Sequence, residues 1–307
     1  MSAFAYLHSR TGTQQYLDAS VRAARFLTRE AWDPAASTFP FEPGAELAYF
    51  FDLGIIIRGL LSAWRATGDE EFRSCAREAA LSLAFDFLDD TVFHPVISLP
   101  EKQPLTPDRR WSRNPGCYQL KSAVAWLDLG DEHAARLFER ALAYSLATHQ
   151  TFLDRESNRE KLMDRLHAYC YFMEALLWVA DRPEVRTVLQ GGIVRTGVLL
   201  REIAPEFERS DVGAQLLRIR LIAAYLGAVP LDEEAAVDEV ERVLSFHAPN
   251  HALTIDARVR GGFWFGRKAS TMLPFSNPVS TAFCAQALAL WNDHQAGRWS
   301  FQLPQLI

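Results

Sequence analysis

The sequence predicts an all-α protein: an (α/α) toroid of about five to six helical hairpins, with a short β-hairpin in the 247–275 loop. Apolar residues recur at helical spacing almost everywhere, whereas the alternating pattern of strands is rare. Amphipathic segments also alternate along the chain with segments that are apolar on all sides, and helices of the second kind lie inside a protein. Outer and inner helices in alternation are typical of two concentric rings. We therefore expect one toroid domain over residues 1–307.

The individual helices are bounded by turn signals. "ATGDEE" at 66–71 places Gly68 after one helix and acidic residues in the first turn of the next. "ADRPEV" at 180–185 supplies Pro183, which favours a helix start. The periodicity predicts helices over 12–30, 46–66, 69–88, 115–129, 132–148, 163–180, 183–203, 208–227, 231–246 and 276–294.

The spacing of the inner helices separates a toroid from a helical-repeat solenoid, the competing architecture. Solenoid units repeat with a fixed period, whereas the inner helices here begin at uneven intervals. Two long connections, 89–114 and 247–275, each precede an inner helix, and connections of that length are usually functional. The second contains "LTIDARVRGGFWFGRK", whose alternating runs around Gly261 and Gly262 predict the β-hairpin.

Composition excludes several classes of function. The 307 residues carry a net charge of −6, which disfavours nucleic-acid binding, and no apolar run is long enough to span a bilayer. The first residues lack a secretory pattern, so we expect a cytoplasmic protein without membrane partners. The four cysteines stand singly, and no phosphate-binding glycine loop or serine-hydrolase motif occurs. We expect no metal and no cofactor.

Polar residues interrupt the inner helices near their starts, and we call each such row a polar seam. Within "DRLHAYCYFMEALLWVA" at 164–180, the polar residues follow at helical steps of three or four, which places them on one side of the helix. Each seam alone fits a satisfied core network or a helix cap, but together they predict a shared pocket, because unpaired polar groups are costly to bury. The seams are Asp164, His167, Tyr171 and Glu174; Glu46, Tyr49 and Asp52; Tyr118 and Lys121; Asp211, Gln215 and Arg218; and Ser276, Asn277, Ser280 and Thr281.

Three of these residues are predicted to be catalytic: Asp52, His167 and Asp211. Asp52 sits in "AYFFDLGIII", where a charged carboxylate without a partner would be unfavourable. His167 is a proton-transfer candidate or a satisfied core histidine, and Asp211 is an acid or a charge that compensates a helix start. Glu174 lies deeper and is expected to pair with Arg218 or Arg58. The predicted substrate-binding residues are Tyr49, Tyr118, Lys121, Tyr171, Arg218, Trp264 and Arg267.

Both long connections carry excess positive charge. Between 101 and 113, Lys102, Arg109, Arg110 and Arg113 stand against Glu101 and Asp108, which leaves +2. Between 254 and 268, Arg258, Arg260, Arg267 and Lys268 stand against Asp256, which leaves +3. In an acidic protein such loops favour an anionic substrate, and Trp111, Phe263, Trp264 and Phe265 would stack on sugar rings. The alternative is that these cations neutralise neighbouring acids.

Three stretches resemble the inner-helix signatures of six-hairpin, glycosidase-like (α/α) toroid proteins: "AYFFDLGIIIRGLLSAWRATGDEEF", "LHAYCYFMEALLWVA" and "GGFWFGRK…SNPVSTAFCAQALALW". That superfamily includes unsaturated glucuronyl hydrolases and sugar 2-epimerases. The resemblance implies that substrates bind where the inner helices begin, with aspartate, glutamate or histidine as acid and base. Only Asp52, His167 and Asp211 match by position. The five hairpins counted here depart from six, so either the ring is incomplete or the long loops replace a sixth pair.

These observations predict a carbohydrate-active enzyme of glycoside hydrolase, epimerase or lyase type. It would act by acid–base catalysis on a small-molecule or oligosaccharide substrate, with an acidic, uronate-bearing sugar expected. A non-catalytic helical toroid that binds a glycan or a partner is the alternative, and a helical scaffold for another protein is a third. The scaffold predicts a continuous apolar surface, whereas the other two predict a pocket.

Overall fold

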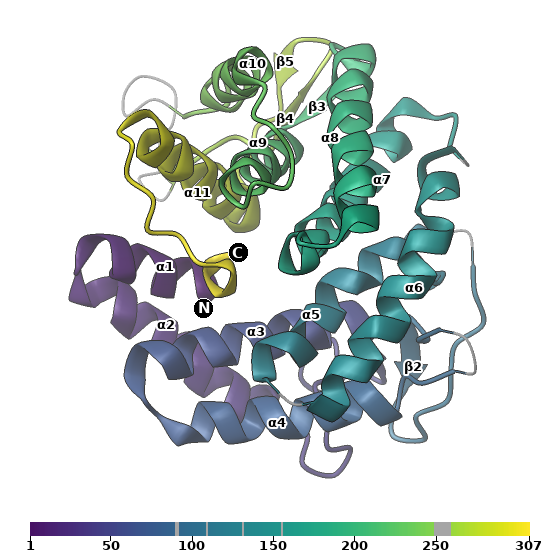
Figure 1. Cartoon of the computed structure of the whole chain (residues 1–307). Helices are drawn as coiled ribbons and strands as arrows, with labels where there is room; N and C mark the ends of the chain where they lie inside the picture. Colours follow the sequence, from purple (N-terminus) through teal and green to yellow (C-terminus); the bar gives the residue numbers. More distant parts are fainter. Residues whose placement is uncertain (90–91, 109, 131, 155, 249–258) are drawn as a thin grey trace. The chain divides into compact units, whose positions relative to one another are not determined.

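The computed structural model describes residues 1–307 except 90–91, 109, 131, 155 and 249–258 (Figure 1). These residues form two compact units, each of which is described by itself. Unit 1 comprises Met1–His149 with Gln302–Leu306, and unit 2 comprises Gln150–Phe301 with Ile307. The expected single domain over 1–307 stays a prediction. Among the described residues, no helix combines the length and the apolarity that crossing a bilayer requires.

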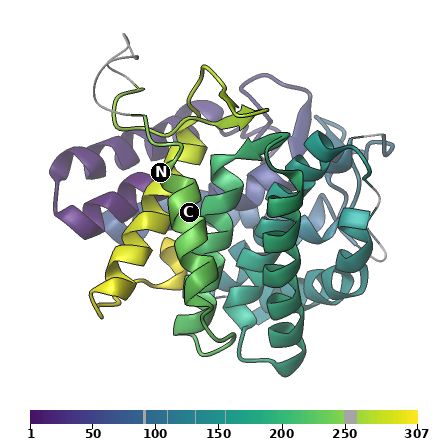
Figure 2. The same ribbon diagram turned by 90° about the horizontal axis from the view of Figure 1, so that it is seen from above.

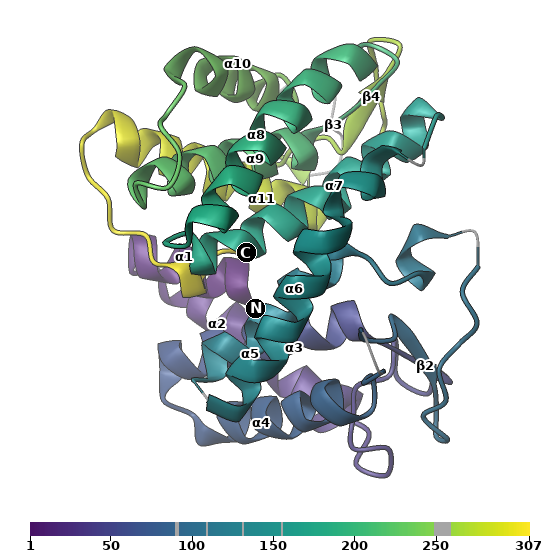
Figure 3. The ribbon, with the colours of Figure 1, turned by 45° about the vertical axis from the view of Figure 1, so that its right-hand side comes forward.

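Unit 1 is built around helix α3 (Phe50–Thr67). It packs on α1 (Ser2–Thr11), α2 (Gln14–Phe26), α4 (Glu70–Phe85) and α5 (Leu120–Leu129), and the closest of these associations are with α4 and α5 (Figure 3). A π-helical segment, Leu27–Ala31, follows α2, and α6 (Glu132–Asp154) completes the helices that begin in this unit. Strands β1 (Leu47–Tyr49) and β2 (Val96–Ser98) pair antiparallel.

Unit 2 is built in the same way around α9 (Ser210–Tyr225). This helix packs on α7 (Arg159–Leu176), α8 (Pro183–Ile203), α10 (Glu233–Leu244) and α11 (Pro278–Gln295), with the yellow α11 alongside the green α9 (Figure 2). Strand β3 (Phe207–Arg209) pairs antiparallel with β4 (Gly266–Lys268), which pairs with β5 (Thr271–Met272). All-α architecture is therefore confirmed, with strands of two or three residues only.

The burial of the helices follows the predicted alternation. Every residue of α9 from Ser210 to Ala223 is buried, as the apolar sequence requires, whereas outer helix α10 buries only four residues. Local signals also act as predicted at the joints. Gly68 ends α3 with a φ of +74°, and the Asp69 carboxylate accepts the backbone N–H of Glu71 at the start of α4.

The predicted starts of two inner helices were wrong. Residues 46–49 and 208–209 were assigned to helices, but Leu47–Tyr49 and Phe207–Arg209 are strands β1 and β3. Each strand leads directly into a helix, and its backbone groups pair with a segment distant in sequence, which helical periodicity cannot reveal. Glu46 and Tyr49 consequently do not share a helical face with Asp52.

The predicted β-hairpin in the 247–275 loop exists, but its turn is not at Gly261–Gly262. Strands β4 and β5 are joined by Ala269 and Ser270, which both have positive φ, at 45° and 67°. That conformation matches a two-residue primed turn, for which glycine or asparagine is the usual signal. The first of the two alternating runs, including Asp256 and Arg258, lies outside the described residues.

Candidate active site

The candidate site lies in unit 2, where polar residues from three inner helices and one strand meet. Helix α7 supplies His167, α9 supplies Asp211 and Gln215, α11 supplies Ser280, and the end of β3 supplies Arg209. Strand β3 fixes the start of α9 because its pairing with β4 is very close. A Cβ on Gly266 would lie 2.3 Å from the carbonyl oxygen of Glu208, so only glycine fits at this position.

His167 is held by the side chain of Gln215. The imidazole Nδ1 lies 2.7 Å from Oε1 of Gln215 and 3.9 Å from Oδ2 of Asp211. The rings of Tyr171 and Phe283 flank the imidazole, at centroid distances of 4.6 Å and 6.3 Å. Among the described residues, Nε2 has no hydrogen-bond partner. The side chain is 15% exposed.

Asp211 is enclosed by hydrogen-bond donors. Arg209 donates from Nε to Oδ1 at 3.0 Å and from its terminal nitrogen to Oδ2 at 2.7 Å, and Ser280 donates to Oδ2 at 3.2 Å. The other terminal nitrogen of Arg209 donates to Asp164 at 2.7 Å. Paired bonds of this kind suit the planar guanidinium, which also lies 4.8 Å over the ring of Phe265.

The charges of the site follow from this arrangement. Burial raises the pKa of Asp211, but the charges of His167 and Arg209 and the donors Arg209 and Ser280 outweigh it, so the pKa is lowered. Burial lowers the pKa of His167 below its ordinary value; Arg209 lowers it further, and Asp211 opposes the shift. At neutral pH the site therefore holds an ionised aspartate beside a neutral imidazole.

The deeper part of the α7 seam is a buried ion pair, as predicted for Glu174 and Arg218. Their oxygen and nitrogen lie 2.5 Å apart, and both side chains are fully buried. Arg218 also donates to Oε1 of Gln286 at 2.8 Å. Complete burial favours a supporting role for Arg218 over the predicted contact with a sugar.

Unit 1 holds two further seams. Asp52, in the first turn of α3, has no hydrogen bond or ion pair with any described residue, and burial raises its pKa to about 6. Tyr49 is half-buried, on β1. Tyr118 and Lys121 are buried, and the Tyr118 hydroxyl lies 3.0 Å from the carbonyl oxygen of Asn114. These residues and His167 belong to different units.

The cations of the long connections are mostly paired. In unit 1, Lys102 pairs with Asp86, and Arg110 and Arg113 pair with Asp108. In unit 2, Arg267 pairs with Glu208 and Lys268 pairs with Glu160. Trp264 is half-buried, and its backbone N–H donates to the carbonyl oxygen of Phe246. Arg109 and Arg258 lie outside the described residues.

No protein-family model matches the chain, and no curated protein matches it by sequence. Cellobiose 2-epimerase from Spirochaeta thermophila superposes with a TM-score of 0.72 at 12% identity, over 95% of this chain and 84% of that one. A D-mannose isomerase gives 0.65 at 12% identity, over 95% and 84%. The GH76 α-mannanase of Bacteroides thetaiotaomicron gives 0.61 at 10% identity, over 96% and 84%.

The chain has the (α/α) toroid fold that these three proteins share. The predicted fold class is thus confirmed. Consecutive helices of this toroid protein form the packed pairs α1–α2, α3–α4, α7–α8 and α9–α10, and α11 packs on α9. Similarity at this level of identity establishes the fold, while function has to be argued from the site.

Sequence analysis gave no site role to two residues of the candidate site, Arg209 and Gln215. Arg209 stands two residues before Asp211, and that spacing was available as a signal, but helical periodicity assigned both to one helix. Gln215 was recognised as part of a seam and not as a partner of His167, because the contact joins residues 48 positions apart.

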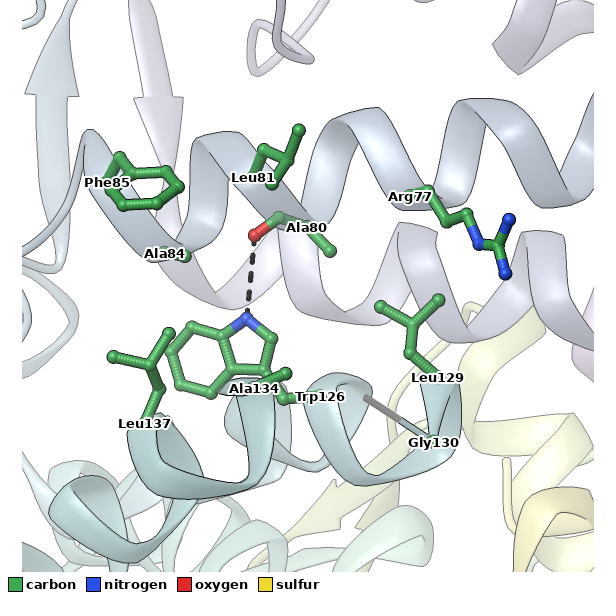
Figure 4. Close-up of a pocket in the computed structure, with 10 residues that line it drawn as sticks. All are labelled: Arg77, Ala80, Leu81, Ala84, Phe85, Trp126, Leu129, Gly130, Ala134 and Leu137. Carbon is green, nitrogen blue, oxygen red and sulfur yellow. Dashed lines mark hydrogen bonds between the residues drawn. The ribbon is translucent and has the colours of Figure 1, made fainter. Parts of the chain in front are cut away.

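A separate cavity in unit 1 of the toroid protein does not resemble an acid–base site. It has a volume of about 370 Å³ and lies among α4, α5 and α6 (Figure 4). Trp126 forms its floor, donating its indole N–H to the carbonyl oxygen of Ala80 at 3.5 Å. Arg77, at one end, is the one ionisable side chain among the ten lining residues, so the cavity offers no acid and base pair.

Proposed function

We propose that this protein is a carbohydrate-active enzyme of glycoside hydrolase, epimerase or lyase type that works by acid–base catalysis, with His167 as a proton-transfer group. The fold supports the substrate class. Proteins that share it are a cellobiose 2-epimerase, a D-mannose isomerase and an α-mannanase, which by name act on sugars. The reaction type rests on the chemistry of the site.

One observation carries the proposal: Nδ1 of His167 is anchored on Gln215, while Nε2 has no hydrogen-bond partner among the described residues. The lowered pKa of the ring favours its neutral form. An anchored ring holds its free nitrogen in a fixed direction, as a general base requires. When Nε2 accepts a proton, the carboxylate of Asp211, 3.9 Å from Nδ1, stabilises the imidazolium. Two steps follow: removal of a proton from the sugar, and its return or transfer to a leaving group.

The other predicted residues take roles that fit their surroundings. Asp211 keeps its charge and stabilises His167, since its oxygens are already occupied by Arg209 and Ser280. Asp52, with its raised pKa, is the proposed proton donor. Tyr171, Trp264 and Tyr49 remain the proposed sugar contacts, whereas burial of Tyr118 and Lys121 favours a supporting role, as it does for Arg218.

The cations of the long connections bear on whether the substrate is anionic. Lys102, Arg110, Arg113, Arg267 and Lys268 each have a carboxylate partner, which leaves less positive potential than the sequence suggested. A uronate-bearing substrate therefore has weaker physical support than a sugar substrate as such. The assay includes neutral and acidic sugars so that the two are distinguished.

The test is turnover in D₂O, followed by NMR, with cellobiose, mannose and uronate-bearing disaccharides. Deuterium incorporation, isomer formation or bond cleavage each reports proton transfer. The variant His167→Asn keeps an N–H donor near the Nδ1 position and removes Nε2, so turnover should fall by about 10²-fold or more while sugar binding persists. His294→Asn is the matched control, because His294 is a partly exposed histidine of the same unit that pairs with Glu233.

Unchanged turnover in His167→Asn would contradict the proposal. Thermal stabilisation by a sugar without turnover of any substrate would instead favour the glycan-binding alternative.

A further inference from the structure

The side-chain amide of Gln215 has one hydrogen-bonded atom and one unpaired atom among the described residues. Its side chain is fully buried on α9, and its oxygen Oε1 lies 2.7 Å from Nδ1 of His167. Its nitrogen Nε2 is buried without any hydrogen-bond partner among the described residues. Unpaired buried donors are rare in proteins and each calls for an explanation.

The orientation of this amide decides where the imidazole carries its proton. A carbonyl oxygen can only accept a hydrogen bond, so Nδ1 of His167 must donate, and a neutral ring then has its lone pair on Nε2. The reversed amide would turn its NH₂ group to Nδ1. The proton of the neutral ring would then sit on Nε2, and His167 could not act as a base through this nitrogen.

The carboxylate of Asp211 is not placed to take over this role. Asp211, the nearest carboxylate, lies 3.9 Å from Nδ1, beyond hydrogen-bond distance. Its two oxygens are held in place by the guanidinium of Arg209, which is itself anchored on Asp164, and by Ser280. The carboxylate therefore supplies charge to the ring but no acceptor at Nδ1.

We propose that Gln215 is a positioning residue that fixes His167 in the Nδ1–H tautomer and so makes Nε2 the proton acceptor. The role of Nε2 in turnover rests on the proposed function, whereas the tautomer itself does not. The unpaired Nε2 of Gln215 fits this role. Reversing the Gln215 amide would place its own Nε2 against Nδ1 of His167 and give it a partner. The structure has the opposite orientation, which leaves Nε2 of the imidazole available as a proton acceptor.

The test is the ¹⁵N–¹H correlation spectrum of the histidine rings in the full-length protein at neutral pH, without substrate. The signals of His167 are assigned by their loss in His167→Asn. Two-bond couplings distinguish the two neutral tautomers, and we expect the Nδ1–H form. Free histidine favours the Nε2–H form, so this result requires a specific partner at Nδ1.

The variant Gln215→Met keeps the size of the side chain and removes the acceptor. We expect the ring signals to shift toward the Nε2–H form, and kcat to fall by about 10²-fold with KM little changed. The matched control is Gln119→Met, since Gln119 is also a buried, hydrogen-bonded glutamine but belongs to unit 1. It should leave the ring signals of His167 unaltered.

Two results would overturn the proposal: an Nε2–H tautomer in the wild-type protein, or an unchanged His167 spectrum in folded Gln215→Met. The wild-type spectrum decides the tautomer even if the variant does not fold. Since the spectrum needs no substrate, its failure is distinct from a failure of the proposed function, which the sugar assay reports.

Discussion

The carboxylate of Glu174 and the guanidinium of Arg218 lie 2.5 Å apart with both side chains fully buried. The pair joins α7 to α9, and Arg218 extends the link to α11 through Oε1 of Gln286 at 2.8 Å and through the ring of Phe283, 4.0 Å from the guanidinium carbon. One buried cation therefore connects three inner helices. These same helices carry His167, Asp211 and Ser280, so the pair underlies the candidate site.

Removing one partner should be far more damaging than removing both. Glu174→Leu leaves the Arg218 charge buried without its carboxylate, and we expect a loss of about 3–5 kcal/mol in the free energy of unfolding. The double variant Glu174→Leu/Arg218→Met replaces the pair with apolar groups and should recover much of that loss. Urea denaturation at pH 7 compares both variants with the wild type. A single variant as stable as the wild type would show that the pair is not buried in solution.

Close packing between α3 and α5 depends on Gly54. A Cβ at this position would lie 2.4 Å from Cβ and 2.5 Å from Cα of Ser122, and backbone atoms cannot move away cheaply. Gly54→Ala should therefore destabilise the protein by about 1–3 kcal/mol. Gly191→Ala on α8 is the control, because nothing lies within 4 Å of its added Cβ, and better helix propensity should stabilise by about 0.5–1 kcal/mol. Thermal unfolding curves of the two variants should thus shift in opposite directions.

The helices were predictable because their causes are local. Periodicity, Gly68 and Pro183 sit within the segments they define, so helices such as α8 appear at the predicted bounds of 183–203. Helix α1 was missed because its ten residues bury only Tyr6 and give little apolar periodicity.

The parts that sequence analysis missed depend on contacts between distant segments. Residues Leu47–Tyr49 fit a helical pattern, yet they form a strand because Val96–Ser98 pairs with them. In the site, the polar seams identified His167 and Asp211, which lie together in unit 2. The pairing of His167 with Gln215, and the occupation of Asp211 by Arg209, follow from the three-dimensional packing of α7 on α9, which no spacing encodes.

Asp52 should make stability depend on pH. Burial raises its pKa to about 6 in the folded protein, above the ordinary value of an aspartate. The unfolded chain therefore loses this proton first, and the folded state loses stability as pH rises from about 4 to 6, with a full penalty of roughly 1–3 kcal/mol above that range. Asp52→Asn removes the penalty, so its melting temperature should exceed that of the wild type at pH 8 and equal it near pH 4. Equal melting temperatures throughout would mean that the Asp52 carboxylate is well solvated.

The pH dependence of turnover should report the charges around His167. Burial and Arg209 lower the pKa of this imidazole, while Asp211 and Glu174 oppose them. The base form therefore persists below about pH 6.5, the ordinary value for histidine, so the acid limb of kcat/KM should lie at more acidic pH. Ionisation of the proposed proton donor Asp52, whose pKa is about 6, should lower kcat/KM on the alkaline side. Asp211→Asn removes the nearest negative charge and leaves Arg209 anchored on Asp164. Because the imidazolium then loses its stabilising charge, the pKa of His167 should fall and the acid limb should move to still lower pH. The maximal rate should decrease for the same reason. The test is the pH dependence of kcat/KM from pH 4 to 8 for the wild type and this variant. An acid limb that moves to higher pH would show that Asp211 does not act on His167.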